Sequence, residues 1–236
     1  MPLFVGTRRI LRPVPSASGG GDTPTYVAVG TNVSLNSIES PLLSVPYYSG
    51  LAANDIGFVQ IGGYVGGAGG FTFPTVSGWT LIDDQQASPG QTHQAVYWKR
   101  LTGSESGTED FQLVTTSESN IATAVMFGIR GCVTSGTPYE DQDVASGTNA
   151  SMTAATITTL GSNRLVLRIH MDEDAGSSSV PASWTQRFEV VETAANAMTT
   201  ALDTIAQSSA GTVSASTRTA GFAANYVIHT MAMIPT

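Results

Sequence analysis

The sequence has little charge of either sign and almost no lysine. Charged residues make up 12% of the 236 residues, about half of their share in an ordinary soluble domain. Lys99 is the only lysine, and the net charge is −8. We therefore expect no nucleic-acid binding through a broad basic face, because neutralising phosphates requires clustered Lys and Arg. The shortage of Glu and Lys also disfavours long surface helices.

Cysteine and long apolar runs are scarce as well. Cys132 is the single cysteine, so the chain cannot form a disulfide within itself. No run approaches the roughly 18 consecutive apolar residues of a membrane-spanning helix. The first residues, MPLFVGTRRILRPVPS, also lack the apolar run of a secretory signal. The sequence thus predicts no membrane association and no export signal.

Serine, threonine and glycine supply about a third of the chain, and they separate short apolar or alternating stretches. Such stretches, joined by Gly, Pro, Asn, Asp and Ser, are typical of antiparallel strands linked by turns. The sequence therefore predicts an all-β protein, an antiparallel β-sandwich or jelly-roll-like fold. The predicted strands are 26–33, 56–61, 80–82, 95–99, 111–115, 122–129, 165–170, 187–191, 212–216 and 226–234.

Residues 1–24 differ from the rest of the chain. Residues 1–12 contain three arginines and no acidic residue, while four prolines and Gly19–Gly21 favour an extended, flexible arm. Large apolar side chains in this arm need another surface to cover them. We therefore expect an arm at 1–24 that docks on a partner and one β-sandwich domain at 25–236. The predicted docking residues are Leu3, Phe4, Arg8, Arg9, Ile10, Leu11 and Arg12.

The domain contains one sequence pattern twice, at 55–131 and 163–235. Trp79 and Trp184 each follow a proline by a few residues, and MFGI (126–129) matches MAMI (231–234). The segment 55–61 aligns with 163–169, and 96–108 aligns with 200–212. This pattern predicts two duplicated four-strand units that share one core. It also predicts a strand at 201–205, where alanine-rich sequence would otherwise suggest a helix. Trp79 and Trp184 are expected to be equivalent core residues.

No catalytic or metal-binding motif is present. His93, His170 and His229 form no closely spaced pair, and Gly103–Gly107 has Glu where a serine hydrolase needs its nucleophile. The acidic runs 140–143 and 172–174 are expected to be solvated loops. We therefore predict no enzymatic activity, no catalytic residue, no metal and no cofactor.

Aromatic residues offer the one alternative to a purely structural role. Tyr47, Tyr48, Tyr97 and Trp98 are candidates for surface recognition of a sugar. Tyr97 and Trp98 point to opposite faces of a strand, so at least one of them is expected to be exposed.

A set of local motifs resembles a family of β-sandwich modules of bacteriophage virion proteins, of the accessory-capsid or tail-fibre type. These motifs are an Asp-led strand (55–61), the Gly78-Trp79-Thr80 corner, the strand ending in Lys99-Arg100 and the ending Ile129-Arg130-Gly131. The resemblance spans residues 26–235. It implies a structural protein that is assembled in the host cytoplasm into the virion.

Residues and resemblance together predict a non-enzymatic phage structural protein, a head decoration or a tail- or fibre-associated protein. Its arm would dock on capsid or tail subunits, and it would form a homo-oligomer in the particle. The alternative is a carbohydrate-binding or receptor-binding adhesion module that recognises a host-surface glycan. Neither function involves nucleic acid or a membrane.

Overall fold

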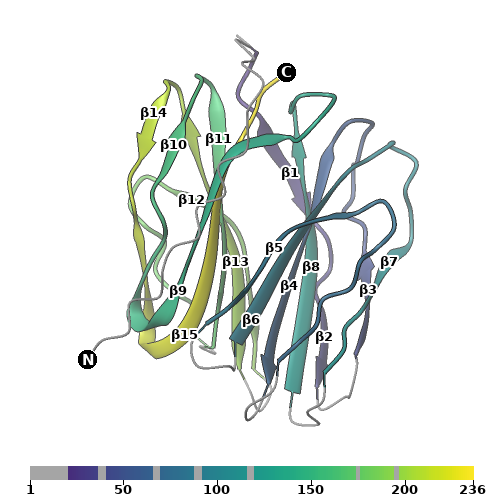
Figure 1. Cartoon of the computed structure of the whole chain (residues 1–236), viewed down its shortest axis with the longest axis vertical. Coiled ribbons are helices and arrows are strands. Elements are labelled where there is room, and N and C mark those ends of the chain that lie inside the picture. The colour runs from purple at the N-terminus through teal and green to yellow at the C-terminus, as the bar shows by residue number, and fades with distance from the viewer. Residues whose placement is uncertain are drawn as a thin grey trace.

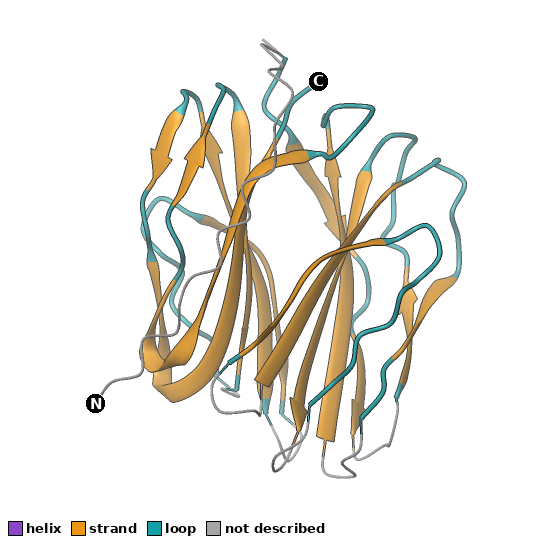
Figure 2. Ribbon diagram, viewed as in Figure 1, coloured by secondary structure: helices purple, strands orange, loops and turns teal. Residues whose placement is uncertain are grey.

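The structure, a computed structural model, describes residues 21–36, 41–65, 70–87, 92–115, 120–173, 176–193 and 197–236. Within these residues every regular element is a β-strand (Figure 2). All strand pairs are antiparallel. The predicted all-β, antiparallel class is therefore confirmed.

The first half of the chain forms one large sheet and a small covering sheet. The large sheet contains β1 (Thr25–Val29), β2 (Val33–Asn36), β4 (Ile56–Val65), β5 (Thr80–Gln86), β6 (Thr92–Arg100) and β8 (Asn120–Arg130). Its order is β1-β8-β4-β6-β5, and β2 also pairs with β8. The covering sheet pairs β3 (Leu42–Pro46) with β7 (Thr108–Gln112). We call this half the first sandwich.

The second half repeats this plan and is called the second sandwich. Its large sheet contains β9 (Tyr139–Thr153), β11 (Arg164–Asp172), β12 (Thr185–Glu192), β13 (Met198–Gln207) and β15 (Thr217–Met233). Its order is β12-β13-β11-β15-β9, and the covering sheet pairs β10 (Ile157–Thr159) with β14 (Gly211–Val213). The two sandwiches pack through their large sheets (Figure 1).

The strand orders of the two large sheets are equivalent. We match β4 with β11, β5 with β12, β6 with β13 and β8 with β15. With this match, the order β8-β4-β6-β5 of the first large sheet is the same as the order β15-β11-β13-β12 of the second. Across the sheets, β6 lies against β15 and β5 lies against β9. The two large sheets therefore share one strand order and face each other within a single chain. The repeat expected from the sequence would likewise match these strands, and it stays a prediction.

The same turn precedes both tryptophans. Gly78 has φ 80° and Ser183 has φ 70°, and the next residue, Trp79 or Trp184, donates its N–H to the carbonyl three residues earlier. Gly adopts this left-handed conformation without a steric cost, whereas Ser183 carries a side chain in it. A further pair of left-handed residues, Asn54 and Asn163, precedes β4 and β11.

These conformations correct the residue-by-residue alignment. Asn54 matches Asn163, so Ile56 matches Leu165, which is one residue later than the sequence alignment places it. The faces agree, because Ile56 and Leu165 both point into the core between the large sheets. The sequence alignment was wrong by one residue here, and such a slip exchanges the two faces of a strand. The segment 198–207 is a strand, as the repeat predicted.

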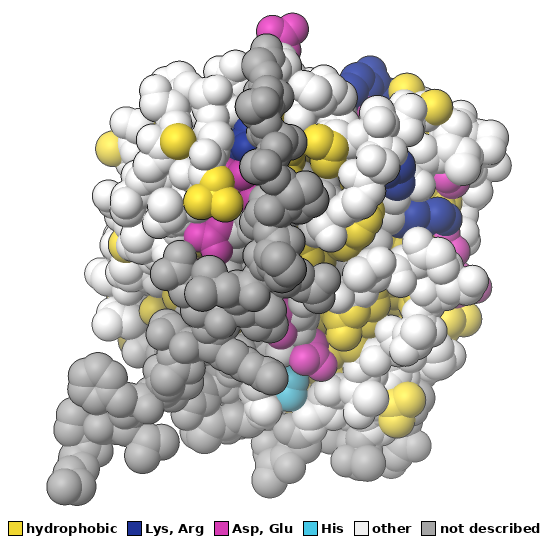
Figure 3. Space-filling model, turned by 45° about the horizontal axis from the view of Figure 1, so that its top comes forward, with side chains coloured by type: hydrophobic (Ala, Val, Ile, Leu, Met, Phe, Trp, Pro, Cys, Tyr) yellow, Lys and Arg dark blue, Asp and Glu magenta, His cyan; other side chains and the backbone are white. Residues whose placement is uncertain are grey.

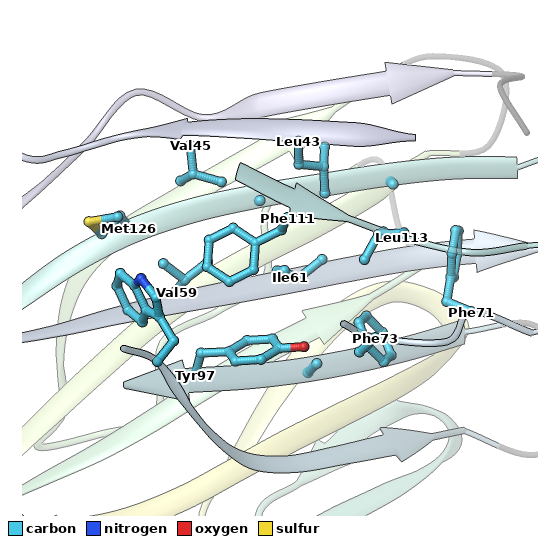
Figure 4. Close-up of a cluster of buried hydrophobic side chains, with 14 of the residues drawn as sticks. Leu43, Val45, Val59, Ile61, Phe71, Phe73, Tyr97, Phe111, Leu113 and Met126 are labelled. Atoms are coloured by element: carbon cyan, nitrogen blue, oxygen red, sulfur yellow. The ribbon is translucent and has the colours of Figure 1, made fainter. Parts of the chain in front are cut away.

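Apolar side chains form separate layers. The core between the large sheets includes Phe58, Phe127, Leu167 and Met231, and the rings of Phe127 and Phe188 are 5.7 Å apart across it. A second core fills the first sandwich between its large and covering sheets (Figure 4). A smaller cluster lies beneath β10 and β14. The shared core that was predicted is thus accompanied by an outer core in each sandwich.

Candidate functional site

The outer faces of the two large sheets differ in chemistry although their strands are equivalent. In the first sandwich this face is apolar, and it is covered by β3 and β7 (Figure 4). In the second sandwich the equivalent positions carry polar and charged side chains that are almost fully buried. Val59, Ile61, Tyr97 and Met126 correspond to Arg168, His170, Asp203 and Thr230. We call the polar residues of this face, together with Glu189 and Arg218, the polar cluster.

Arg218 is the centre of the polar cluster. It lies near the start of β15, and only 3% of its side chain is exposed. Its Nη1 donates to Asp203 Oδ2 (2.9 Å), its Nη2 to Glu189 Oε1 (2.8 Å) and its Nε to Ser178 Oγ (2.8 Å). One guanidinium therefore ties β12, β13 and the loop before β12 to β15. Removing it would break the ion pairs of both Asp203 and Glu189 in the interior.

Arg168 lies beside this network on β11. Its guanidinium carbon is 3.9 Å from the ring centroid of Trp184, and its Nη2 donates to the carbonyl of Ser214 (2.9 Å). Burial lowers the pKa of Arg168 to about 10, although the charge of Asp203 opposes this change. Burial also raises the pKa of Asp203, which Arg218 partly offsets. Trp184 is half-buried, covers the buried Arg168 guanidinium and packs against the small cluster beneath β10 and β14, so it is not the fully buried equivalent of Trp79 that was expected.

His170 is fully buried and lies on the same face of β11, two residues after Arg168. Its Nε2 lies 3.3 Å from Asp172 Oδ2 and 3.3 Å from the sulfur of Met152. Burial and the charge of Arg218 hold the pKa of His170 well below its ordinary value. The imidazole therefore stays neutral near pH 7 and has no contact with solvent.

The polar cluster joins strands and offers no reaction site that a substrate can reach in this structure. His170, Asp172 and Asp203 have no exposed surface, and Arg168 and Arg218 have almost none. Within the described parts of the chain, no three His, Cys, Asp or Glu side chains are grouped to hold a metal ion. Its chemistry is that of buried, charge-assisted hydrogen bonds, which fix the strands they connect.

The acidic runs 140–143 and 172–174 are not the solvated loops that were expected. Glu140 binds Arg164 in a buried ion pair (2.8 Å), and Asp141 accepts the backbone N–H of Thr158 (2.8 Å). Asp172 ends β11 and is buried. These carboxylates therefore hold β9, β10 and β11 together. Asp174 lies outside the described residues.

Two of the four aromatic residues proposed for surface recognition are buried. Tyr48 and Tyr97 are 2% and 1% exposed, and the Tyr97 hydroxyl donates to the carbonyl of Pro74 (2.8 Å). The expectation that they contact a ligand at the surface is therefore wrong for both. Tyr97 and Trp98 do point to opposite faces, but Trp98 packs half-buried against the core between the sheets.

Tyr47 remains partly exposed in a small cluster around the single lysine. Lys99 Nζ lies 5.6 Å from the ring centroid of Trp79 and 5.8 Å from that of Tyr47. The same nitrogen is 3.3 Å from Glu109, which also accepts the Tyr47 hydroxyl. Burial and hydrogen bonding to Glu109 raise the pKa of Tyr47, so its hydroxyl stays protonated. Trp79 itself is buried, as expected.

The motif residues behind the family resemblance have structural roles. Arg130 binds the buried Asp55 through two nitrogens, each at 2.7 Å, and it also donates to the carbonyl of Gly50. Gly78 and Gly131 both have positive φ, at 80° and 84°. The Asp-led strand and the Arg-Gly ending are therefore adjacent in space and form one structural tie of the first sandwich.

The predicted docking residues Leu3, Phe4, Arg8, Arg9, Ile10, Leu11 and Arg12 lie outside the described residues. The description begins at Gly21, whose carbonyl accepts from Asn163 Nδ2 (3.0 Å). Pro24 lies against Gly131 of the first sandwich, and Gly131 accepts the N–H of Thr236 (3.0 Å). The described chain thus begins where the two sandwiches meet.

Surface charge is sparse on the face drawn in Figure 3. The visible Lys and Arg side chains lie close to acidic ones, with apolar side chains scattered between them. Across the described ranges, no helix is long and apolar enough to cross a membrane. Comparisons with protein-family models, with curated protein sequences and with solved structures find no match to this chain.

Proposed function

We propose that the chain is a non-enzymatic structural component of a bacteriophage particle, held there by residues 1–20. The observation that carries this proposal is a β-sheet body that is cross-linked by ion pairs with buried carboxylates and that follows directly on a segment rich in arginine and large apolar residues. The polar groups of the body bind one another across strands, as the ties of Arg218 and Arg130 illustrate. The apolar and arginine side chains of residues 1–20 would contact the partner, through apolar packing and ion pairs.

The family resemblance supports a virion context, and the acidic body supports docking by the arm. The whole chain has a net charge of −8, yet residues 1–12 contain only arginine as a charged residue type. A basic arm favours an acidic partner surface, and it does so through orientation and association rate more than through affinity. A head decoration and a tail- or fibre-associated protein both fit these features.

Recognition of a host-surface glycan is the second candidate, and one cluster favours it. Tyr47 offers part of an aromatic ring beside Lys99 and Glu109, which is the mixture of ring and hydrogen-bonding groups that sugars contact. Its weakness is that Tyr48 and Tyr97 are buried. A Tyr47→Ala chain that loses binding to a glycan array would support this role.

The test of the main proposal is the protein content of purified particles. Mass spectrometry of density-purified virions from the phage that encodes this chain should find it in a fixed ratio to the capsid or tail proteins. A chain lacking residues 1–20 should be absent from the particles while melting within about 2 °C of the full chain. Purified virions that lack the full-length chain would overturn the proposal.

The deletion must end before Gly21, so that a loss of docking is not confused with a loss of folding. A longer deletion through residue 29 removes β1, whose Tyr26 pairs with Ile129 and packs on the core between the sheets. We expect that longer variant to lose thermal stability, and it serves as the control for a deletion that damages the fold.

A further inference from the structure

The large sheets of the described chain have several open edges. In the first sandwich β5 pairs with β6 alone, and β1 and β2 pair with β8 alone. In the second sandwich β12 and β9 are the terminal strands. A terminal strand presents unpaired backbone N–H and C=O groups, to which another extended chain can add.

These edges differ in their charge and in whether other residues lie over them. The β9 carboxylates of Glu140 and Asp141 already accept the backbone N–H groups of Leu160 and Thr158, which lie over that edge. On β12, Glu189 is bound by Arg218, and Arg187 adds a positive charge. The strands β1 and β2 contain no acidic residue.

Only β5 combines negative charge with an exposed apolar side chain. Its sequence, TLIDDQQ, contains Asp83 and Asp84 and no basic residue. Leu81 is 38% exposed, and Asp84 and Gln86 are exposed as well. A strand that adds here would meet carboxylates and one apolar contact.

Residues 3–12 complement the β5 edge in charge and in apolar character. The sequence LFVGTRRILR contains three arginines and no acid, and its apolar side chains can be divided between the two faces of an extended chain. Pro2 and Pro13 flank this stretch without interrupting it. Its arginines would lie within reach of the Asp83 and Asp84 carboxylates while Leu or Ile contacts Leu81.

We propose that residues 3–12 of one copy add as a strand to the β5 edge of a second copy. The proposal rests on the proposed function, because it names the partner of the same docking segment. Donor and acceptor are different surfaces, so the contact is head-to-tail. Such contacts close into a ring or continue as a filament, depending on the rotation between copies.

The decisive experiment is complementation between two defective chains. One chain lacks residues 1–20 and keeps the β5 edge, while the other keeps the arm and carries Asp84→Lys. Light scattering after size exclusion should show each variant alone as a monomer, whereas their mixture should contain a one-to-one complex. The wild-type chain should form larger species at the same concentration, and these should dissociate as NaCl rises from 50 to 500 mM.

Three further variants keep the result interpretable. Asp110→Lys changes an exposed carboxylate on β7, a strand of the covering sheet, and it should leave association unchanged. If Asp84→Lys does not fold, Gln86→Lys on the same edge replaces it. Exchanging Arg8, Arg9 and Arg12 for Glu should abolish association with the wild-type edge and restore it with Asp84→Lys.

A wild-type chain that stays monomeric at 100 μM in 50 mM NaCl would overturn the strand addition between copies. So would a mixture of the two variants that forms no complex, because the intact arm of one chain would then have failed to bind the intact β5 edge of the other. If the arm is nevertheless required for entry into particles, the proposed function stands and the partner is a different virion protein. If the chain associates but is absent from virions, the proposed function alone fails.

Discussion

Acidification should destabilise this protein through His229, a histidine in the core between the large sheets. His229 lies on β15 between Ile169 of β11 and Val144 of β9, two residues before the core residue Met231. It is 2% exposed, and burial lowers its pKa from 6.5 to about 3. The folded state therefore resists a proton that the unfolded chain accepts readily.

The sign and size of the effect follow from that difference. Because the pKa is lower in the folded state, the unfolded state binds more protons as the pH falls below 6.5. Stability is then lost at about 1.4 kcal/mol per pH unit until the pH approaches 3. Between pH 7.5 and pH 5 this one group should cost about 2 kcal/mol. His170 acts in the same direction, because its pKa is also lowered.

Urea unfolding at intervals between pH 7.5 and pH 5 measures this loss directly. The His229→Leu variant removes one titrating group, so its free energy of unfolding should fall less steeply with decreasing pH, by about 1.4 kcal/mol per unit. The free energy of unfolding of the variant at pH 7.5 is the reference for the rest of its pH profile. Parallel pH profiles for the variant and the wild type would refute the reasoning, because they would show that His229 titrates normally in the folded protein.

The other predictions concern single side chains. Trp79→Ala should cost about 3 to 5 kcal/mol in urea unfolding, and the half-buried Trp184→Ala should cost clearly less; equal losses would contradict the observed burial. Arg218→Met should cost about 3 to 5 kcal/mol, because it breaks the buried ion pairs of Asp203 and Glu189. Lys99→Met, which breaks a half-exposed ion pair, should cost no more than about 1 kcal/mol and is its control. Cys132 should react with a thiol reagent only after unfolding, since burial raises its pKa to about 12; modification of the native protein would disprove this.

The strands and their repetition could be predicted because local signals recur at equivalent places. Gly78 and Ser183 form the same turn before the same residue type, and the apolar alternation on either side specifies strands. The exact alignment was missed by one residue in β4 and β11 and in β8 and β15, and by two residues in β6 and β13. Few identities connect the copies, and only the left-handed Asn54 and Asn163 fix the correspondence.

The polar cluster was not predicted, although its pattern is visible in the sequence. In β11 the residues Arg164, Arg168, His170 and Asp172 share one face, while leucine and isoleucine occupy the other. Such alternation shows that two faces of a strand differ, and the polar one is usually assumed to face water. Here the start of β15 returns over that face, and Arg218 supplies the compensating charge. That long-range contact has no local signal in the sequence.

Gly21 and Thr236 lie so close that a methyl group on Gly21 would be 1.9 Å from the Thr236 carbonyl oxygen. The path of the described chain therefore almost closes on itself, and the two sandwiches could be connected in either order. A circular permutant that joins Thr236 to Gly21 through a short glycine linker and opens at the exposed Ser135 would synthesise the second sandwich first. It would retain every strand pair described here, because Ser135 lies between β8 and β9.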